Sequence, residues 1–467
     1  MIDQNLDPIT THPPPLSSII QQVPDDVLAE IFLSSLSDDI RDSSNPNKSP
    51  LLVTHICSQW RRVAHLTPRL WRRIDIPVNR GTQTTVQGRF QRIYDVGKEQ
   101  AIKELVEQWL FRSGTGLSLD IIIRGRRTRL VLEVILPFAS RWRQISFISP
   151  DRAGLDHLKT ISSSDVPLLE EFSLGIGEEE ADFQNREDYI PFGCLQAPML
   201  RKLAVKRLLI DSLINIGGWE RLTHFSLNAE TEDTTTFSYE SSKVARLLTL
   251  CTNLTSFTGI LRNMDPNAFI DQTSISLPFL SSLSIHQDIS SVYITQNLSL
   301  QNLTNLRLHQ SLFILGRSML REVVMQCGSV LQSLTTDKTM YGAGELLDCL
   351  RNCPNLKSLT TQATFGLPLE ERTYWNSDPH SHIWDDKFLR GLIPSVDSQI
   401  ICPKLEIFKC VQQVMFSDTI LFDFVKGRRG STALKYVGVK MKDAPENEFI
   451  ISFLQPFIHE GLVFEFL

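Results

Sequence analysis

The stretch LQNLTNLRL, Leu300 to Leu308, ends in the pattern Leu-x-x-Leu-x-Leu, formed by Leu303, Leu306 and Leu308. Ten further segments, such as APMLRKLAV and LPFLSSLSI, follow the same template with mostly apolar residues in these places. In chain order, the first apolar position of the template is Trp142, Leu169, Leu200, Leu222, Leu254, Leu280, Leu303, Leu331, Leu356, Leu405 and Leu434. Neighbouring positions are 22 to 32 residues apart, except for one interval of 49 residues after Leu356. This spacing is typical of leucine-rich repeats.

Each segment is expected to form a short strand whose leucines point inward, followed by a return segment that is often helical. SSKVARLLTLC and GRSMLREVVMQC have the periodicity of such return helices. Because no repeat can bury its leucines alone, the repeats should stack on one another. The sequence thus predicts an α/β fold, with a curved leucine-rich-repeat solenoid over residues 139–467 and parallel strands on its concave face. The longest interval contains TYWNSDPHSHIWDDKF, which predicts an inserted loop near residues 362–386.

The N-terminal part of the chain has a different pattern. Residues 1–22 include three consecutive prolines and are expected to be a flexible segment. Residues 23–74 predict a module of three short helices, in which the polar stretch from Ser37 to Pro50 is a surface loop. Residues 75–138 predict an irregular linker or capping unit with a helix in EQAIKELVEQWLFRSG and a strand in LSLDIIIRG. The apolar positions expected to form the helical core are Leu28, Ile31 and Phe32, then Val53, Ile56, Cys57, Trp60, Val63 and Ala64, then Leu70 and Trp71.

Three features occur in order between Val23 and Ile74: the helix start VPDDVLAEIF, the core of LLVTHICSQWRRVAHLTPRLW, and its final Pro-x-Leu-Trp. Together with the repeats they resemble F-box proteins, in particular the expanded F-box-like families of fungi with irregular leucine-rich repeats. This sequence departs from the family at Val23, where leucine is usual, and in the loop from Ser37 to Pro50, which is longer than in compact F-boxes.

The resemblance implies that the module binds the Skp-type adaptor of a cullin-RING ubiquitin ligase, and that the repeats bind a protein substrate. The chain would be the non-catalytic substrate-recognition subunit of a Skp-cullin-F-box ligase. An alternative is a leucine-rich-repeat scaffold outside any ligase, whose F-box-like helices only cap the solenoid. Carried over by position, the adaptor-binding residues would be Val23, Pro24, Leu28, Ile31, Phe32, Ile56, Cys57, Trp60, Val63, Leu70 and Trp71.

A substrate surface is expected on the repeat strands, where the residues between inward leucines should lie on the concave face. This face is polar and lightly basic, although a merely solvated surface would have the same composition. The candidate substrate-binding residues are Lys202, Lys206, His224, Asn228, His286, Asn305, Arg307 and His309.

The formal net charge of −6 gives no global reason to bind nucleic acid or an anionic membrane. The start of the sequence lacks a secretory signal pattern, and no apolar run reaches about 18 residues. We therefore expect no nucleic-acid partner and no membrane partner. We expect the protein to be located in the cytoplasm, the nucleus or both. One basic run is formed by Arg61, Arg62, Arg69, Arg72 and Arg73. It could be a solvated face of the module or, alternatively, a local patch that binds the phosphates of nucleic acid.

The eight cysteines raise the question of a zinc site, but the sequence has no pair of Cys-x-x-Cys units. Cys251, Cys353 and Cys402 each lie three residues before a template leucine, which indicates a packing position of the repeat. His380 and His382, in DPHSHIWDD, could belong to a metal or acid–base site, but loop histidines beside a helix-capping aspartate need no such role. We therefore expect no metal, cofactor or catalytic residue.

Overall fold

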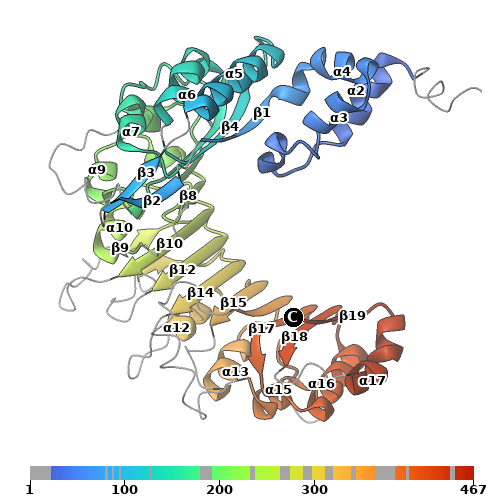
Figure 1. Cartoon of the computed structure of the whole chain (residues 1–467). Helices are drawn as coiled ribbons and strands as arrows, with labels where there is room; N and C mark the ends of the chain where they lie inside the picture. Colours follow the sequence, from blue (N-terminus) through green and yellow to red (C-terminus); the bar gives the residue numbers. More distant parts are fainter. Residues whose placement is uncertain are drawn as a thin grey trace, which may run out of the picture. The chain divides into compact units, whose positions relative to one another are not determined.

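The chain divides into two compact units, Met1–Phe147 and Ile148–Leu467, in a computed structural model (Figure 1). The predicted boundary at residues 138/139 lies shortly before this division. The predicted flexible segment 1–22 and nearly all of the predicted inserted loop, residues 363–383, lie outside the described residues. The structure describes residues 23–78, 82–86, 89–93, 96–126, 128–178, 192–231, 237–262, 274–287, 297–310, 319–337, 343–362, 384–395, 399–441 and 448–467.

The first unit begins with a group of short helices: α2 (Asp25–Ser34), α3 (Leu51–Ile56) and α4 (Ser58–His65), with the 3-10 helices η1 (Ile40–Ser44) and η2 (Pro68–Trp71). Both α2 and α3 pack against α4. The periodic apolar positions from Val53 to Ala64 predicted one helix of the module, and this is wrong, because Cys57 is extended and separates α3 from α4. Its thiol accepts a hydrogen bond from the amide of Trp60 and so caps α4.

The polar stretch between α2 and α3 is not simply a surface loop. Its middle forms η1, which packs on strand β1 (Arg73–Pro77) and buries Ile40 and Ser43. The Ser43 hydroxyl accepts the amide hydrogen of Asp75 at 2.9 Å, and the Arg73 guanidinium donates to the carbonyl of Ser37 at 2.9 Å. The prediction of a surface loop is therefore wrong for this part, because its polar groups are partners of β1.

The rest of the first unit combines strands and helices. Strands lie in the order β1, β4 (Leu119–Arg124) and β5 (Trp142–Ile148), and β1 and β4 pair in parallel. Helix α5 (Val96–Arg112) packs against α6 (Thr128–Ile135), which continues into η3 (Leu136–Arg141). The predicted helix and strand are α5 and β4, whereas β1 and the antiparallel hairpin of β2 (Thr82–Val86) and β3 (Arg89–Ile93) were not predicted.

The second unit contains a long sheet of parallel strands whose spatial order follows the chain. Each template segment after the first leads into one of these strands, which confirms the predicted α/β repeat architecture. The last strand, β19, follows no template segment. The short strand β9 (Tyr239–Glu240) pairs with β10, and β11 (Ile275–Ser276) pairs with β13 (Leu298–Ser299). The main strands are β6 (Glu171–Gly175), β7 (Lys202–Lys206), β8 (His224–Ser226), β10 (Ser256–Arg262), β12 (Ser282–Gln287), β14 (Asn305–Gln310), β15 (Ser333–Asp337), β16 (Ser358–Gln362), β17 (Ile407–Val414), β18 (Tyr436–Met441) and β19 (Val463–Phe466).

Helices form a second layer beside this sheet (Figure 1). The two predicted return helices are α10 and α12. From α12 onward the helices contact one another in sequence: α12 with α13, α13 with α15, α15 with α16, and α16 with α17. Two 3-10 helices, η5 (Gly193–Gln196) and η6 (Trp219–Arg221), lie shortly before β7 and β8. The α-helices are α7 (Arg152–Leu158), α9 (Ile210–Ile214), α10 (Ser241–Leu248), α12 (Met319–Cys327), α13 (Ala343–Arg351), α15 (Asp386–Leu392), α16 (Asp418–Ser431) and α17 (Glu448–His459).

A recurring turn explains the cysteine spacing. The first apolar residue of every template segment is buried, and in several repeats its amide donates to the carbonyl three residues earlier. Cys251, Cys353 and Cys402 supply that carbonyl, and each thiol also donates to a main-chain carbonyl at 3.3 to 3.5 Å. All three are buried, so the structure confirms that they occupy a packing position of the repeat.

Candidate functional site

The helical module of the first unit, α2 to η2, closes its core with aromatic side chains. The rings of Phe32 and Trp60 lie 5.0 Å apart between α2 and α4. Trp71 is fully buried, donates its indole N–H to the carbonyl of Ala64 at 2.7 Å, and packs edge-on against Trp109 of α5 at 4.8 Å. The Arg112 guanidinium lies 4.7 Å above the Trp71 ring, and partial burial lowers the pKa of Arg112. The module is thus packed onto α5 rather than standing free.

Four aliphatic side chains on α2 and α3 remain outside that core. Val27 and Ile31 are 45% and 50% exposed on α2, and Leu52 and Ile56 are 40% and 54% exposed on α3. Each pair is separated by four residues and therefore lies on one side of its helix. The ends of the two helices are joined by a hydrogen bond of 2.6 Å between the hydroxyls of Ser35 and Ser49. We call these four residues the exposed aliphatic set.

The structure divides the predicted adaptor-binding residues into three groups by exposure. Pro24, Ile31 and Ile56 are exposed, and Val23, Cys57 and Trp60 are half-buried. Val27 and Leu52 were not predicted, although their positions four residues before Ile31 and Ile56 could have indicated them. The remaining predicted residues are 3% exposed or less and belong to the module core, so they are not accessible to a partner: Leu28, Phe32, Val63, Leu70 and Trp71.

The basic run that suggested a phosphate-binding patch is engaged within the first unit. Arg61 donates to the carbonyl of Thr54 at 2.8 Å, and Arg73 donates to the carbonyls of Ser37 and Asp38. These two arginines are thus bound to α3 and to the segment after α2. The other three form ion pairs with residues of α2 and β4: Arg62 with Asp25 at 2.8 Å, Arg69 with Glu30 at 3.5 Å, and Arg72 with Asp120 at 3.4 Å.

The sheet of the second unit brings several predicted substrate-binding residues into register. Lys202 pairs with His224, and the row continues through Ser256 and Ser282 to Asn305. Lys202, His224 and Asn305 are exposed there, as is Arg307 two residues further along β14; Asn228 is exposed just after β8. Burial, together with the charge of Lys202, lowers the pKa of His224, although Glu171 opposes this shift.

Two predicted substrate-binding residues are buried. Lys206 is 6% exposed and donates to the hydroxyl of Thr231 at 2.8 Å, and His309 is 8% exposed. His286 is half-buried and stacks on His309 with the ring centres 6.1 Å apart. The expectation that Lys206 and His309 are available to a substrate is therefore wrong, because both are buried near the ends of their strands.

The residues weighed for metal or acid–base chemistry are only partly described. His380 and His382 lie outside the described residues. Asp385 accepts the amide hydrogen of Phe388 at 2.9 Å and caps α15, as a helix-capping aspartate does. In the described part of the chain, no group of three or more histidine, cysteine or acidic residues is placed to hold a metal ion, and no helix is long and apolar enough to cross a membrane.

Comparison with known proteins adds little to this geometry. No protein-family model matches the chain, and no curated protein matches it. Among solved structures, it is similar to a chain in the crystal structure of the Rad7 and Elc1 complex of yeast, with a TM-score of 0.34 and 13% identity over 78% of this chain and 87% of that chain. A similarity of this size assigns no activity or partner to the present chain.

Proposed function

We propose that this chain is the non-catalytic substrate-recognition subunit of a Skp-cullin-F-box ubiquitin ligase. In this proposal the helical module is an F-box, the exposed aliphatic set docks a Skp-type adaptor, and the outward face of the repeat strands binds a protein substrate. Ubiquitin transfer is carried out by other subunits, and this chain provides proximity between them and the substrate.

The exposed aliphatic set is the observation that carries the adaptor interface. The module completes its core with Leu28, Phe32, Val63 and Trp71 and still leaves two aliphatic pairs in water. Covering the remaining exposed half of one such side chain contributes about 1 kcal/mol. When a helix docks into an apolar groove, its contacts are made by side chains three or four residues apart, which is the spacing within each of these pairs.

The substrate interface is supported by the register row of the second unit. Lys202, His224 and Asn305 place an ammonium, an imidazole and an amide along neighbouring strands, with the hydroxyls of Ser256 and Ser282 between them. Exposed polar side chains on rigid strands can recognise a polar protein surface without reorganisation of the backbone.

The adaptor interface is tested by measuring the affinity of the full chain for a purified Skp-type adaptor by titration calorimetry. We expect binding by the unmodified chain and a loss of at least about 30-fold in affinity for the double variant Ile31→Asp, Ile56→Asp, because a hot spot contributes about 2 kcal/mol or more. Leu250→Asp is the matched control, since Leu250 is 40% exposed in the second unit and lies outside the module. Absence of binding by the unmodified chain contradicts the proposal.

A repeat scaffold outside any ligase is the second candidate, and the packing of Trp71 on Trp109 favours it. A module that serves only as a cap needs this contact but has no use for the exposed aliphatic set. The cap function therefore predicts that Ile31→Asp, Ile56→Asp leaves every interaction of the protein unchanged. Affinity purification of the unmodified and doubly substituted chains, with identification of bound proteins by mass spectrometry, separates the two candidates.

A further inference from the structure

The outward side of strands β14 to β17 carries two cations that the protein itself does not neutralise. Arg307 of β14 is exposed and Lys409 of β17 is half-buried, and neither side chain has an ion-pair or hydrogen-bond partner in the described part of the chain. Lys202 of β7, by contrast, is held by Glu171 of the neighbouring strand β6 at 3.4 Å. Arg307 and Lys409 are therefore available to an anionic group from outside the chain.

The two cations lie in one register row that crosses four neighbouring strands. Arg307 pairs with Thr335 of β15, Thr335 with Thr360 of β16, and Thr360 with Lys409. The neighbours of these four residues along each strand are buried, so their side chains lie on the side of the sheet opposite the repeat core. Three strand intervals separate the two cations by about 14 Å. We call these four residues the cation row.

Neutral residues occupy the register positions on either side of the cation row. Ser284 of β12 is opposite Arg307, and Gly438 of β18 is opposite Lys409. Glu465 of β19 lies one strand beyond Gly438, and its carboxylate accepts a hydrogen bond from the hydroxyl of Tyr436 at 2.6 Å. No carboxylate of an adjacent strand therefore stands in register with either cation.

An apolar platform borders the Lys409 end of the cation row. The Tyr436 ring lies over Gly438, where a Cβ would come within 2.7 Å of the tyrosine hydroxyl oxygen, so the absence of a side chain makes room for the ring. Ile407 and Val463, the register partners of Tyr436 on either side, are 39% and 50% exposed. A large apolar side chain of a partner can pack there while an anionic neighbour reaches Lys409.

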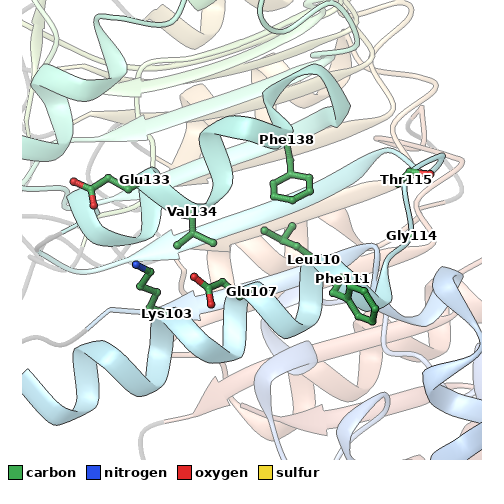
Figure 2. A pocket seen from close by; sticks show the side chains of 9 residues that line it. All are labelled: Lys103, Glu107, Leu110, Phe111, Gly114, Thr115, Glu133, Val134 and Phe138. Atoms are coloured by element: carbon green, nitrogen blue, oxygen red, sulfur yellow. The ribbon is translucent and has the colours of Figure 1, made fainter.

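A hollow of about 730 Å³ in the first unit shows the opposite charge pattern (Figure 2). Its lysine, Lys103 of α5, is accompanied by Glu107 on the same helix and by Glu133 on the opposite wall. Carboxylates thus outnumber the cation at this hollow, which is unsuited to an acidic partner.

We propose that the cation row binds an acidic segment of a protein, with carboxylates engaged by Arg307 and Lys409 and a large apolar side chain placed on Tyr436. Because the row lies on the face assigned above to the substrate, the proposal rests on the proposed function and names its class of substrate. Alternate side chains of an extended segment are about 7 Å apart, so acidic residues four positions apart span the row. Nucleic acid is disfavoured, since two cations about 14 Å apart make few of the phosphate contacts on which its affinity depends.

Selection from a phage-displayed library of random peptides against the purified full chain tests the proposal. We expect enrichment of aspartate and glutamate about four residues apart, next to a large apolar residue. The charge-reversed variant Arg307→Glu, Lys409→Glu should lose this enrichment and select lysine and arginine instead. Arg246→Glu, Lys387→Glu is the matched control, because it makes the same charge change at exposed positions of α10 and α15 and should select acidic peptides as before.

A peptide selected by the unmodified chain then serves as the probe in fluorescence anisotropy. Its Kd should rise at least about tenfold for the neutral variant Arg307→Gln, Lys409→Gln, and equally when its own acidic residues are replaced with glutamine. The neutral variant also decides the matter if charge reversal at the half-buried Lys409 unfolds the chain. Selection without acidic enrichment, or a Kd that the neutral variant leaves unchanged, overturns the proposal.

Two further outcomes separate this site from other functions of the chain. Binding of a single-stranded oligonucleotide that the neutral variant abolishes, without selection of acidic peptides, would make nucleic acid the partner and the proposal wrong. The adaptor titration is independent of the cation row: a chain that selects acidic peptides but binds no adaptor keeps this site and contradicts only the ligase function. A chain that binds the adaptor but selects no acidic peptide overturns only the acidic substrate.

Discussion

At the scale of single residues, His309 links the repeat sheet to pH. It is 8% exposed, stacks on His286 and lies near Arg307; burial, followed by these two charges, lowers its pKa from 6.5 to about 4. The folded chain therefore holds a neutral imidazole that the unfolded chain protonates more readily. The stability associated with this group is complete above pH 6.5 and is lost as the pH falls toward 4.

We predict from this shift that the free energy of unfolding falls by about 2 kcal/mol more in the unmodified chain than in His309→Gln between about pH 7 and about pH 5. Urea denaturation at the two pH values measures the difference. His157→Gln is the control, since His157 lies on α7, away from the contacts of His309, and its replacement should preserve the dependence. Equal dependence in the unmodified chain and in His309→Gln would show that His309 titrates normally.

The same residue shows where the sequence falls short at this scale. Strand alternation puts His309 and Lys206 on the side opposite the buried Leu308 and Val205, but it does not say which neighbouring group covers them. Lys206 reaches the hydroxyl of Thr231, which lies far along the chain. In the module, the sequence motif includes both Phe32 and Ile31 and does not distinguish them. Only the structure shows that Phe32 is buried in the core, whereas Ile31 and Ile56 are exposed and available to a partner.

At the scale of elements, Asp75 joins the segment after α2 to the strands of the first unit. Its carboxylate is fully buried and accepts hydrogen bonds from Arg124 of β4 and, at 3.4 Å, from the hydroxyl of Ser44. Its amide donates to Ser43. The three elements η1, β1 and β4 therefore share one ion pair and its hydrogen bonds.

Replacing Asp75 with alanine should lower the free energy of unfolding by about 3 kcal/mol, because the part-buried Arg124 charge loses this ion pair and η1 loses an anchor. Chemical denaturation monitored by tryptophan fluorescence measures this change. Glu133→Ala is the control, since its ion pair with Arg129 is exposed and should contribute little. Similar losses in both variants would mean that the Asp75 contacts do not hold η1 in place.

Elements were predictable where their signal is periodic. The leucine template predicted the strands of the second unit because Leu303, Leu356 and their equivalents are all buried, and their burial requires the same Leu-x-x-Leu-x-Leu pattern in each repeat. The helix break at Cys57 and the packed helix η1 were missed, since each depends on a single residue's backbone or on polar partners distant in sequence. Strand β1 was missed because its partner β4 lies more than forty residues later.

At the scale of the whole molecule, the module from α2 to η2 is part of the first unit and not a tethered accessory. Trp71 covers Trp109, and Ser43 and Ser44 contact Asp75. Deleting residues 1–74 should therefore lower the melting temperature or cause aggregation even if the module binds an adaptor. Deletion alone cannot separate the ligase subunit from the scaffold.

The double variant Ile31→Asp, Ile56→Asp avoids this difficulty, because both side chains are at least half exposed and contribute little to the module core. We expect it to melt within a few degrees of the unmodified chain, whereas the deletion of residues 1–74 melts markedly lower or aggregates. Differential scanning calorimetry and size-exclusion chromatography compare the two, and deletion of residues 1–22, which removes none of the contacts described, is the control. If the chain that lacks residues 1–74 instead melts at the same temperature as the full chain, then the packing of Trp71 on Trp109 adds nothing to stability. The module is then free to act as an independent docking domain.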